Sequence, residues 1–164
     1  MTILWDSSAL ISLLDETRST HEAALECYWR LREEGELQII SSIAISELAV
    51  KNNPEPIFLE FGFQVQDFNI RHALEAANVK KITMVDKQLR SEQNTRAVIV
   101  NDSQIIGQAL AEQVDYILTE DQNTFCKTVS KLHSKLGMSL QALLLSDDPL
   151  GKIGYTQRLL PLDI

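Results

Sequence analysis

Four acidic residues lie at or near points where the sequence changes from a short apolar run to a helical pattern. They are Asp6, Glu47, Asp102 and Asp121. Carboxylates that converge from distant parts of a chain raise each other's pKa unless positive charge lies among them. A hard divalent cation such as Mg²⁺ or Mn²⁺ meets that need, because it prefers oxygen ligands and is often held by a few carboxylates and a substrate phosphate. The four acids therefore indicate metal-assisted phosphodiester chemistry, provided that the fold brings them together.

Each aspartate also has a purely structural interpretation. Asp is a favourable N-cap residue, because its carboxylate accepts hydrogen bonds from the first free amides of a helix. Capping is therefore the stronger interpretation of any one of these aspartates taken alone. Glu47 is harder to explain, since it lies in IAISELAV, where apolar residues predict a helix buried around much of its girth. A carboxylate buried there is costly without compensation, although Ser46 and Lys51 leave a surface position open.

The elements that must position these acids alternate along the chain. Strands are predicted at residues 3–5, 37–42, 61–69, 115–119 and 139–145. Helices are predicted at residues 7–14, 21–34, 43–52, 71–93, from about Asp102 onward, and at 125–136. This alternation predicts βαβ crossovers and an α/β fold in which a mostly parallel central sheet of about five strands has helices on both faces. Ligands of such folds gather outside the carboxyl ends of the strands, where the four acids would meet.

Length and composition favour one soluble domain. The chain has 164 residues, of which 45% are hydrophobic and 23% charged, enough apolar material for a core. We expect one domain over residues 1–146 and a C-terminal tail of unassigned structure over residues 147–164. No apolar run is long enough to cross a bilayer, and no basic leader begins the chain, so no membrane contact is expected. Cys27 and Cys126 are isolated thiols, and we therefore predict a cytoplasmic protein.

Four motifs, in order along residues 2–145, resemble one known family. They are D-S-S-x-L from Asp6, S-x-x-x-x-E-L from Ser42, D-x-x-I-x-x-x-A from Asp102 and T-x-D-x-x-x-F from Thr119. Together they resemble the PIN-domain ribonucleases, the fold of the VapC-type toxins. Glu120 competes with Asp121 for the fourth acidic position, and Asp121 is preferred because it fits the spacing to Thr119 and Phe125.

The resemblance implies a three-layer α/β/α PIN-like fold and a metal-dependent endoribonuclease that hydrolyses RNA phosphodiesters with Mg²⁺ or Mn²⁺. It implies that four residues are catalytic and bind the metal: Asp6, Glu47, Asp102 and Asp121. Ser8 and Thr119 would support them. The resemblance further implies an RNA substrate, a homodimer, and a small antitoxin protein as partner, as in a type II toxin–antitoxin pair.

Two alternatives remain open on the sequence. One is a catalytically idle PIN-like module that binds RNA or protein, and the other is an RNA-processing nuclease that is not a toxin. Phosphatases of the haloacid-dehalogenase type are excluded, because they need a second Asp where this chain has Ser8. No Walker-type phosphate-binding sequence is present.

The net charge and the local distribution of charge point in opposite directions on whether the protein binds nucleic acid. The net charge of −8 argues mildly against a polyanionic partner. Two local groups of basic residues could nevertheless contact phosphates, or could be solvated helix faces. One group is Arg71, Lys80, Lys81, Lys87, Arg90 and Arg96, and the other is Lys127, Lys131 and Lys135.

Overall fold

A five-stranded parallel sheet forms the centre of the molecule, as the alternating pattern predicts. The computed structural model describes residues 1–50, 53–85 and 96–155. The strand order is β3-β2-β1-β4-β5, and every neighbouring pair is parallel. The strands are β1 (Thr2–Trp5), β2 (Leu37–Ser41), β3 (Gln64–Gln66), β4 (Tyr116–Thr119) and β5 (Gln141–Leu144).

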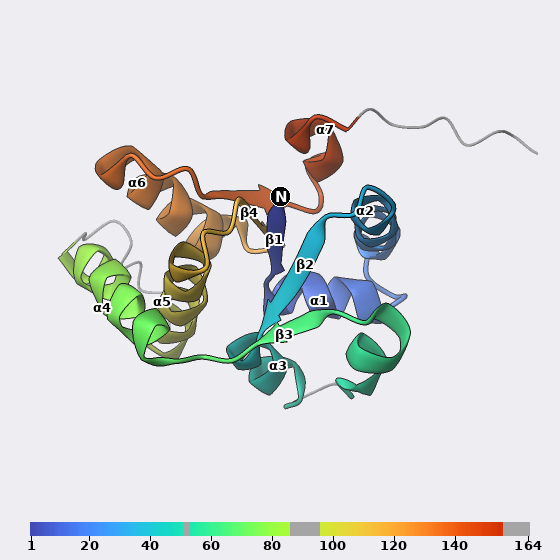
Figure 1. Cartoon of the computed structure of the whole chain (residues 1–164), viewed down its shortest axis with the longest axis horizontal. Coiled ribbons are helices and arrows are strands. Elements are labelled where there is room, and N and C mark those ends of the chain that lie inside the picture. The colour runs from blue at the N-terminus through green and yellow to red at the C-terminus, as the bar shows by residue number, and fades with distance from the viewer. Residues whose placement is uncertain (51–52, 86–95, 156–164) are drawn as a thin grey trace, which may run out of the picture.

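Helices cover both faces of this sheet and give the predicted three layers (Figure 1). The α-helices are α1 (Ser7–Leu14), α2 (His21–Glu33), α3 (Ser42–Leu48), α4 (Ile70–Val85), α5 (Arg96–Ala111), α6 (Lys127–Leu136) and α7 (Pro149–Ile153). Two π-helical segments are η1 (Ile57–Phe61) and η2 (Gln122–Cys126). In Figure 1, α4, α5 and α6 lie on the left of the strands, and α1 and α2 lie on the right. Among the residues described, no helix has both the length and the apolar character needed to span a bilayer.

One predicted boundary that bears on the site is wrong. We expected a helix to begin at about Asp102, but α5 begins at Arg96 and Asp102 lies in its interior. The residues before Asp102 include the β-branched Val98, Ile99 and Val100, which favour a strand by local preference. Tertiary packing overrides such preferences, and α5 packs along its length against α4.

Other predicted elements differ in length from those observed. The strand expected over 61–69 is confined to β3, and the helix expected over 43–52 ends at Leu48. The helix expected over 125–136 begins earlier, as η2. Helix α4 ends at Val85, and the rest of the helix expected over 71–93 lies outside the described residues. In the tail, which the sequence left unassigned, Pro149–Ile153 form α7.

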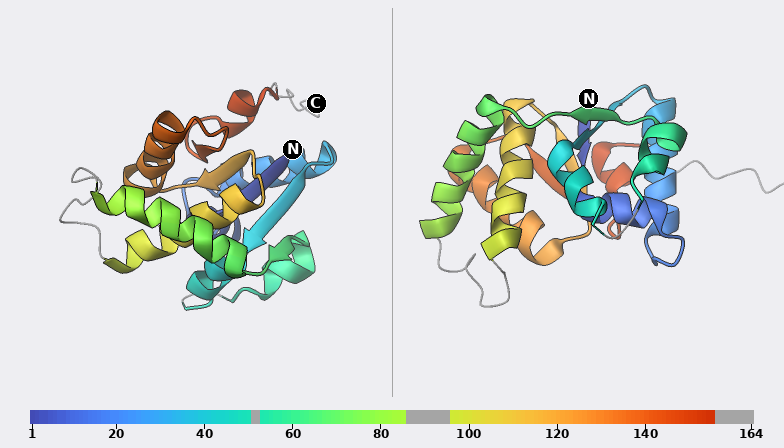
Figure 2. Two further views of the ribbon diagram at one scale, coloured as in Figure 1. Left: turned by 60° about the vertical axis from the view of Figure 1, so that its left-hand side comes forward. Right: turned by 90° about the horizontal axis from the view of Figure 1, so that it is seen from below.

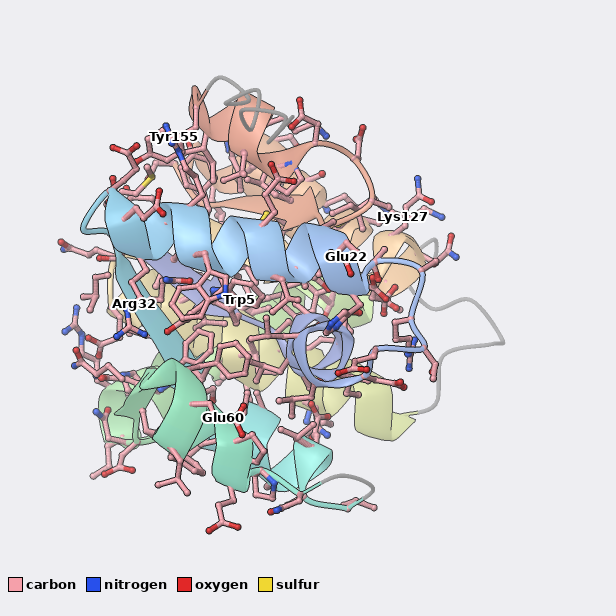
Figure 3. The ribbon with its side chains drawn as sticks, turned by 90° about the vertical axis from the view of Figure 1, so that its right-hand side faces the viewer. Trp5, Glu22, Arg32, Glu60, Lys127 and Tyr155 are labelled. Atoms are coloured by element: carbon pink, nitrogen blue, oxygen red, sulfur yellow. The ribbon has the colours of Figure 1, made fainter. Side chains whose placement is uncertain are left out.

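An aromatic cluster fixes the end of β1. Trp5 is fully buried, with its ring 5.5 Å from that of Phe63 and 6.4 Å from that of Tyr28. Its indole Nε1 donates to Gln38 Oε1 at 3.1 Å. Figure 3 shows Trp5 beneath α2. Because Asp6 directly follows this anchored ring, the backbone that presents its carboxylate is held in place.

Helices α4 and α5 approach each other closely at a glycine. A Cβ atom at Gly107 would lie 2.3 Å from the backbone nitrogen of Ala76, a distance that side chains do not tolerate. Glycine is therefore needed at this crossing, and its presence sets how deeply α5 lies against α4. This crossing positions the part of α5 that contains Asp102.

Candidate active site

The parallel register of β1 and β4 brings Asp6 and Thr119 together. Trp5 lies opposite Leu118, and the backbone N–H of Asp6 donates to the Leu118 carbonyl oxygen at 2.9 Å. Both strands therefore end at the same edge of the sheet. The right-hand view of Figure 2 shows this end of the molecule, where α3 lies between α1 and α5.

Two hydroxyl groups hold the buried Asp6 carboxylate. Ser8 Oγ and Thr119 Oγ1 both donate to Asp6 Oδ2, at 2.8 and 2.9 Å. Ser8 Oγ also accepts from the Glu120 N–H at 2.8 Å. Burial raises the pKa of Asp6 most strongly, while the Ser8 and Thr119 hydrogen bonds lower it and the Glu47 charge raises it further. The two supporting residues named from the sequence thus both contact the first acid.

Glu47 reaches the same end of the sheet from α3. It is half-buried, and its Oε1 accepts from Asn101 Nδ2 at 2.5 Å. Helix α3 begins directly after β2, and the Ser41 side chain caps it by accepting from the Ile43 N–H. Asn101 is a site residue that sequence reasoning missed. Its only signal was its position beside Asp102, because nothing in the local pattern relates it to a residue more than fifty positions earlier.

The charges of the other three acids all act on the pKa of Asp102. Burial raises its pKa to about 8, with further contributions from the charges of Asp6, Asp121 and Glu47, in that order. These three neighbours come from the end of β1, the segment after β4, and α3. The structure therefore brings the four predicted acids together electrostatically, from four separate parts of the chain.

Asp121 is a helix cap as well as a member of this group. Its Oδ1 accepts from the N–H groups of Asn123 and Thr124, at 2.9 and 2.8 Å, and its Oδ2 accepts from the Thr124 hydroxyl. The structural interpretation is thus correct for this residue, while the pKa shift of Asp102 also places it in the acidic cluster. Glu120, its competitor in the sequence, points toward Arg18, with 3.9 Å between its Oε2 and Arg18 Nη1.

The chemistry of this cluster fits a hard divalent cation. The donors are carboxylate and hydroxyl oxygens, which Mg²⁺ and Mn²⁺ prefer. Within residues 1–50, 53–85 and 96–155, no Lys, Arg or His forms an ion pair with any of the four acids. The raised pKa of Asp102 is the result expected when nothing positive separates the carboxylates.

The side chains do not form a closed cage. In the described part of the chain, no three His, Cys, Asp or Glu side chains are grouped closely enough to hold a metal ion together. Asp6 and Asp121 instead use their oxygens in local hydrogen bonds. Asp6, Glu47, Asp102 and Asp121 would therefore hold a cation such as Mg²⁺ partly through water molecules.

Comparisons with known proteins support the fold. No protein-family model matches the sequence, and no curated protein does so either. Solved structures match. The crystal structure of FitAcB from Neisseria gonorrhoeae aligns with a TM-score of 0.61 at 14% identity, over 88% of this chain and 98% of the other. VapBC2 from Rickettsia felis, bound to a DNA fragment from its promoter, aligns with a TM-score of 0.59 at 15% identity, over 87% and 98%.

At such identities the likeness concerns the fold. The chain has the PIN fold of VapC-type proteins, so the resemblance drawn from the four motifs is confirmed at this level. The activity is argued from the acidic site itself, because one fold can host several functions.

Proposed function

We propose that this protein is a metal-dependent endoribonuclease that hydrolyses RNA phosphodiesters. The observation that supports it most is the convergence of four carboxylates from β1, α3, α5 and the segment after β4. Burial and the charges of the other three raise the pKa of Asp102 to about 8. A partly buried cluster of repelling acids is costly to maintain, and a bound cation relieves that cost. The PIN fold supports the same conclusion by analogy.

The site residues would either bind the metal or orient the residues that bind it. Asp6, Asp102 and Asp121 would hold Mg²⁺ or Mn²⁺ directly or through its waters, and Glu47 would complete the shell or orient the attacking water. When bound, the metal stabilises charge on the phosphodiester and lowers the pKa of water. Ser8 and Thr119 would orient the Asp6 carboxylate through the hydrogen bonds described above, and Asn101 would orient Glu47 in the same way.

We further propose that the protein is a cytoplasmic toxin of the VapC type, active as a homodimer and paired with a small antitoxin. FitAcB and VapBC2 support this proposal by their fold likeness. The cation would be Mg²⁺ or Mn²⁺, and RNA the substrate.

The proposal is tested by incubating the purified protein with a panel of fluorescent RNAs and Mg²⁺ or Mn²⁺. Wild type is compared with Asp6→Asn, Asp102→Asn and an EDTA control. Loss of a residue that only orients a metal ligand typically lowers activity 10–100-fold, so loss of a ligand itself should lower cleavage at least about 100-fold. Asp67→Asn is the matched control, because Asp67 is exposed and follows β3 at the edge of the sheet.

Three outcomes separate the candidate functions. Cutting that needs metal and disappears in both site variants, but not in Asp67→Asn, supports the nuclease. Cutting that persists in EDTA or in Asp102→Asn contradicts it. RNA binding with neither cutting nor metal binding would favour the catalytically idle module instead.

A further inference from the structure

A cleft lined by lysines lies beside the acidic site. It is bounded by η2, α6, β5 and α7 and has a volume of about 620 Å³, within the range of sites that take small ligands. Three lysines line it, namely Lys127 and Lys131 of α6 and Lys152 of α7. None of the described residues that line it is acidic. In a chain of net charge −8, this is a local concentration of positive charge.

The segment η2 joins the cleft to the acidic site. Gln122, which lines the cleft, directly follows Asp121 in the chain. Cys126 also lines it, and its backbone N–H donates to the Asp121 carbonyl oxygen at 3.0 Å. The charges around the Cys126 thiol agree with this placement. Its pKa is raised to about 11, by burial first and then by the charges of Asp121 and Asp6, while the charge of Lys152 lowers it.

The spacing of the lysines suits contacts with successive phosphates of a nucleic-acid backbone. Lys127 and Lys131 are one helical turn apart, so their side chains lie roughly 6 Å apart along α6. Lys127 is exposed and its Nζ lies 3.4 Å from Asn123 Oδ1, a weak contact that a phosphate could replace. Figure 3 shows Lys127 at the periphery of the molecule. Lys152 of α7 also lines the cleft, and it pairs with the exposed Asp147.

The apolar and polar parts of the cleft also fit a nucleotide chain. Ala142 and Leu144 of β5 give one apolar wall, while Ser130 and Gln122 present a hydroxyl and an amide. Apolar surface with a few polar groups is typical of sites that take organic ligands, so these residues can accept a ribose beside the phosphate contacts. Lys135, on the same helix, does not line the cleft.

We propose that this cleft binds the sugar–phosphate backbone of single-stranded RNA and leads it to the acidic site. The inference rests on the proposed function, since it names the path by which that substrate arrives. The three lysines of α6 then differ in role. Lys127 and Lys131 bind phosphate together with Lys152 of α7, whereas Lys135 does not.

The test measures binding of a fluorescent single-stranded RNA of mixed sequence by anisotropy, in EDTA, so that no cleavage occurs. The variants are the Lys127→Gln/Lys131→Gln pair, Lys152→Gln, and Lys135→Gln as the matched control. Each phosphate contact on a single strand contributes about 0.7 to the slope of log affinity against log salt. We expect the pair to weaken binding at least about 10-fold and to lower the slope by roughly 1.4. Lys152→Gln should lower the slope by about half as much, and Lys135→Gln should leave it unchanged.

Two results would contradict the proposal that this cleft binds RNA. One is that Lys135→Gln weakens binding as much as the pair does. The other is that the pair binds RNA as wild type does. A second readout separates this failure from failure of the nuclease. If wild type and the pair cut RNA with the same KM, the cleft is wrong and the nuclease stands. If the pair loses RNA binding while wild type cuts nothing with metal, the cleft stands and the nuclease is wrong.

Discussion

At the scale of single residues, the acidic site has two kinds of member. Asp6 and Asp121 accept hydrogen bonds, for example from the Thr119 hydroxyl and from the N–H of Thr124. Asp102 has no such compensation among the causes of its shift, since burial and three carboxylates all raise its pKa. Ionised Asp102 is therefore the residue whose free energy a bound cation would lower the most.

The first prediction concerns the pH dependence of the metal-free protein. The folded state keeps the Asp102 proton to about pH 8, whereas the unfolded chain releases it near 3.8. Between these values the folded state binds more protons, so the free energy of unfolding falls as pH rises. Urea unfolding in EDTA should show wild type losing roughly 1 kcal/mol per pH unit relative to Asp102→Asn across this window.

The matched control for this prediction is Asp67→Asn, which removes an exposed carboxylate outside the cluster. It should follow the wild-type pH dependence. Equal pH dependence in wild type and Asp102→Asn would show that the Asp102 carboxyl titrates normally and that the other three carboxylates do not act on it.

The second prediction concerns Thr119, which is fully buried and donates to Asp6. Thr119→Val keeps the shape and removes the hydroxyl, so Asp6 loses one of its two close donors. Mn²⁺ affinity measured by calorimetry should fall by about 10–100-fold, as is usual when a residue that orients a metal ligand is lost. Thr119→Ser restores the hydroxyl and should retain most of the affinity. Equal affinities in both variants would mean that the hydroxyl does not orient Asp6.

At the scale of elements, the position of α5 decides whether the site exists. This helix contains both Asp102 and Asn101, and it crosses α4 where Gly107 meets Ala76. Asp6, directly after β1, and Glu47 of α3 can lie near Asp102 only if α5 packs at this depth. The crossing is therefore as important to the site as the acids themselves.

The third prediction is that Gly107→Ala destabilises the protein. Helix propensity alone would make this change favourable by about 1 kcal/mol. The new Cβ would lie 2.3 Å from the backbone nitrogen of Ala76, so the helices must separate. We expect a net destabilisation on the order of 1–3 kcal/mol in urea unfolding, together with weaker Mn²⁺ binding. Ser134→Ala, an exposed change in α6, should alter stability little. A more stable Gly107→Ala would contradict the close crossing.

Much of this arrangement follows from the sequence, and the rest does so only through tertiary contacts. The apolar runs before Asp6 and Asp121 predicted β1 and β4, and parallel pairing then brings their ends together. The start of α5 could not be predicted, because β-branched residues before Asp102 favour a strand locally. Asn101 could not be found either, since its partner Glu47 is distant in the chain. Lys152 was missed because the Pro- and Gly-containing tail gives no helical period.

At the scale of the whole molecule, the charges are segregated. The net charge of −8 includes an acidic site at the carboxyl end of the sheet and a lysine cleft beside it. Of the other basic group considered in the sequence, Lys87 and Arg90 lie outside the described residues, as does the side chain of Arg96. A local basic cleft thus answers the objection that an acidic chain should not bind RNA.

The fourth prediction tests the toxin proposal in cells. Induced expression of wild type should arrest bacterial growth, and Asp6→Asn should not, because it removes a proposed ligand. Asp67→Asn should arrest growth as wild type does. Immunoblots establish that the three proteins accumulate equally. Normal growth with wild type at a matched level would favour a nuclease that is not a toxin.

Calorimetric titration with Mn²⁺ at about pH 8 tests whether the four distant carboxylates form one cation site. This measurement needs no knowledge of the RNA target. We predict saturable binding to wild type and to Asp67→Asn, and its loss in both Asp6→Asn and Asp102→Asn. Binding that is absent from wild type, or unchanged in the two site variants, would contradict the claim.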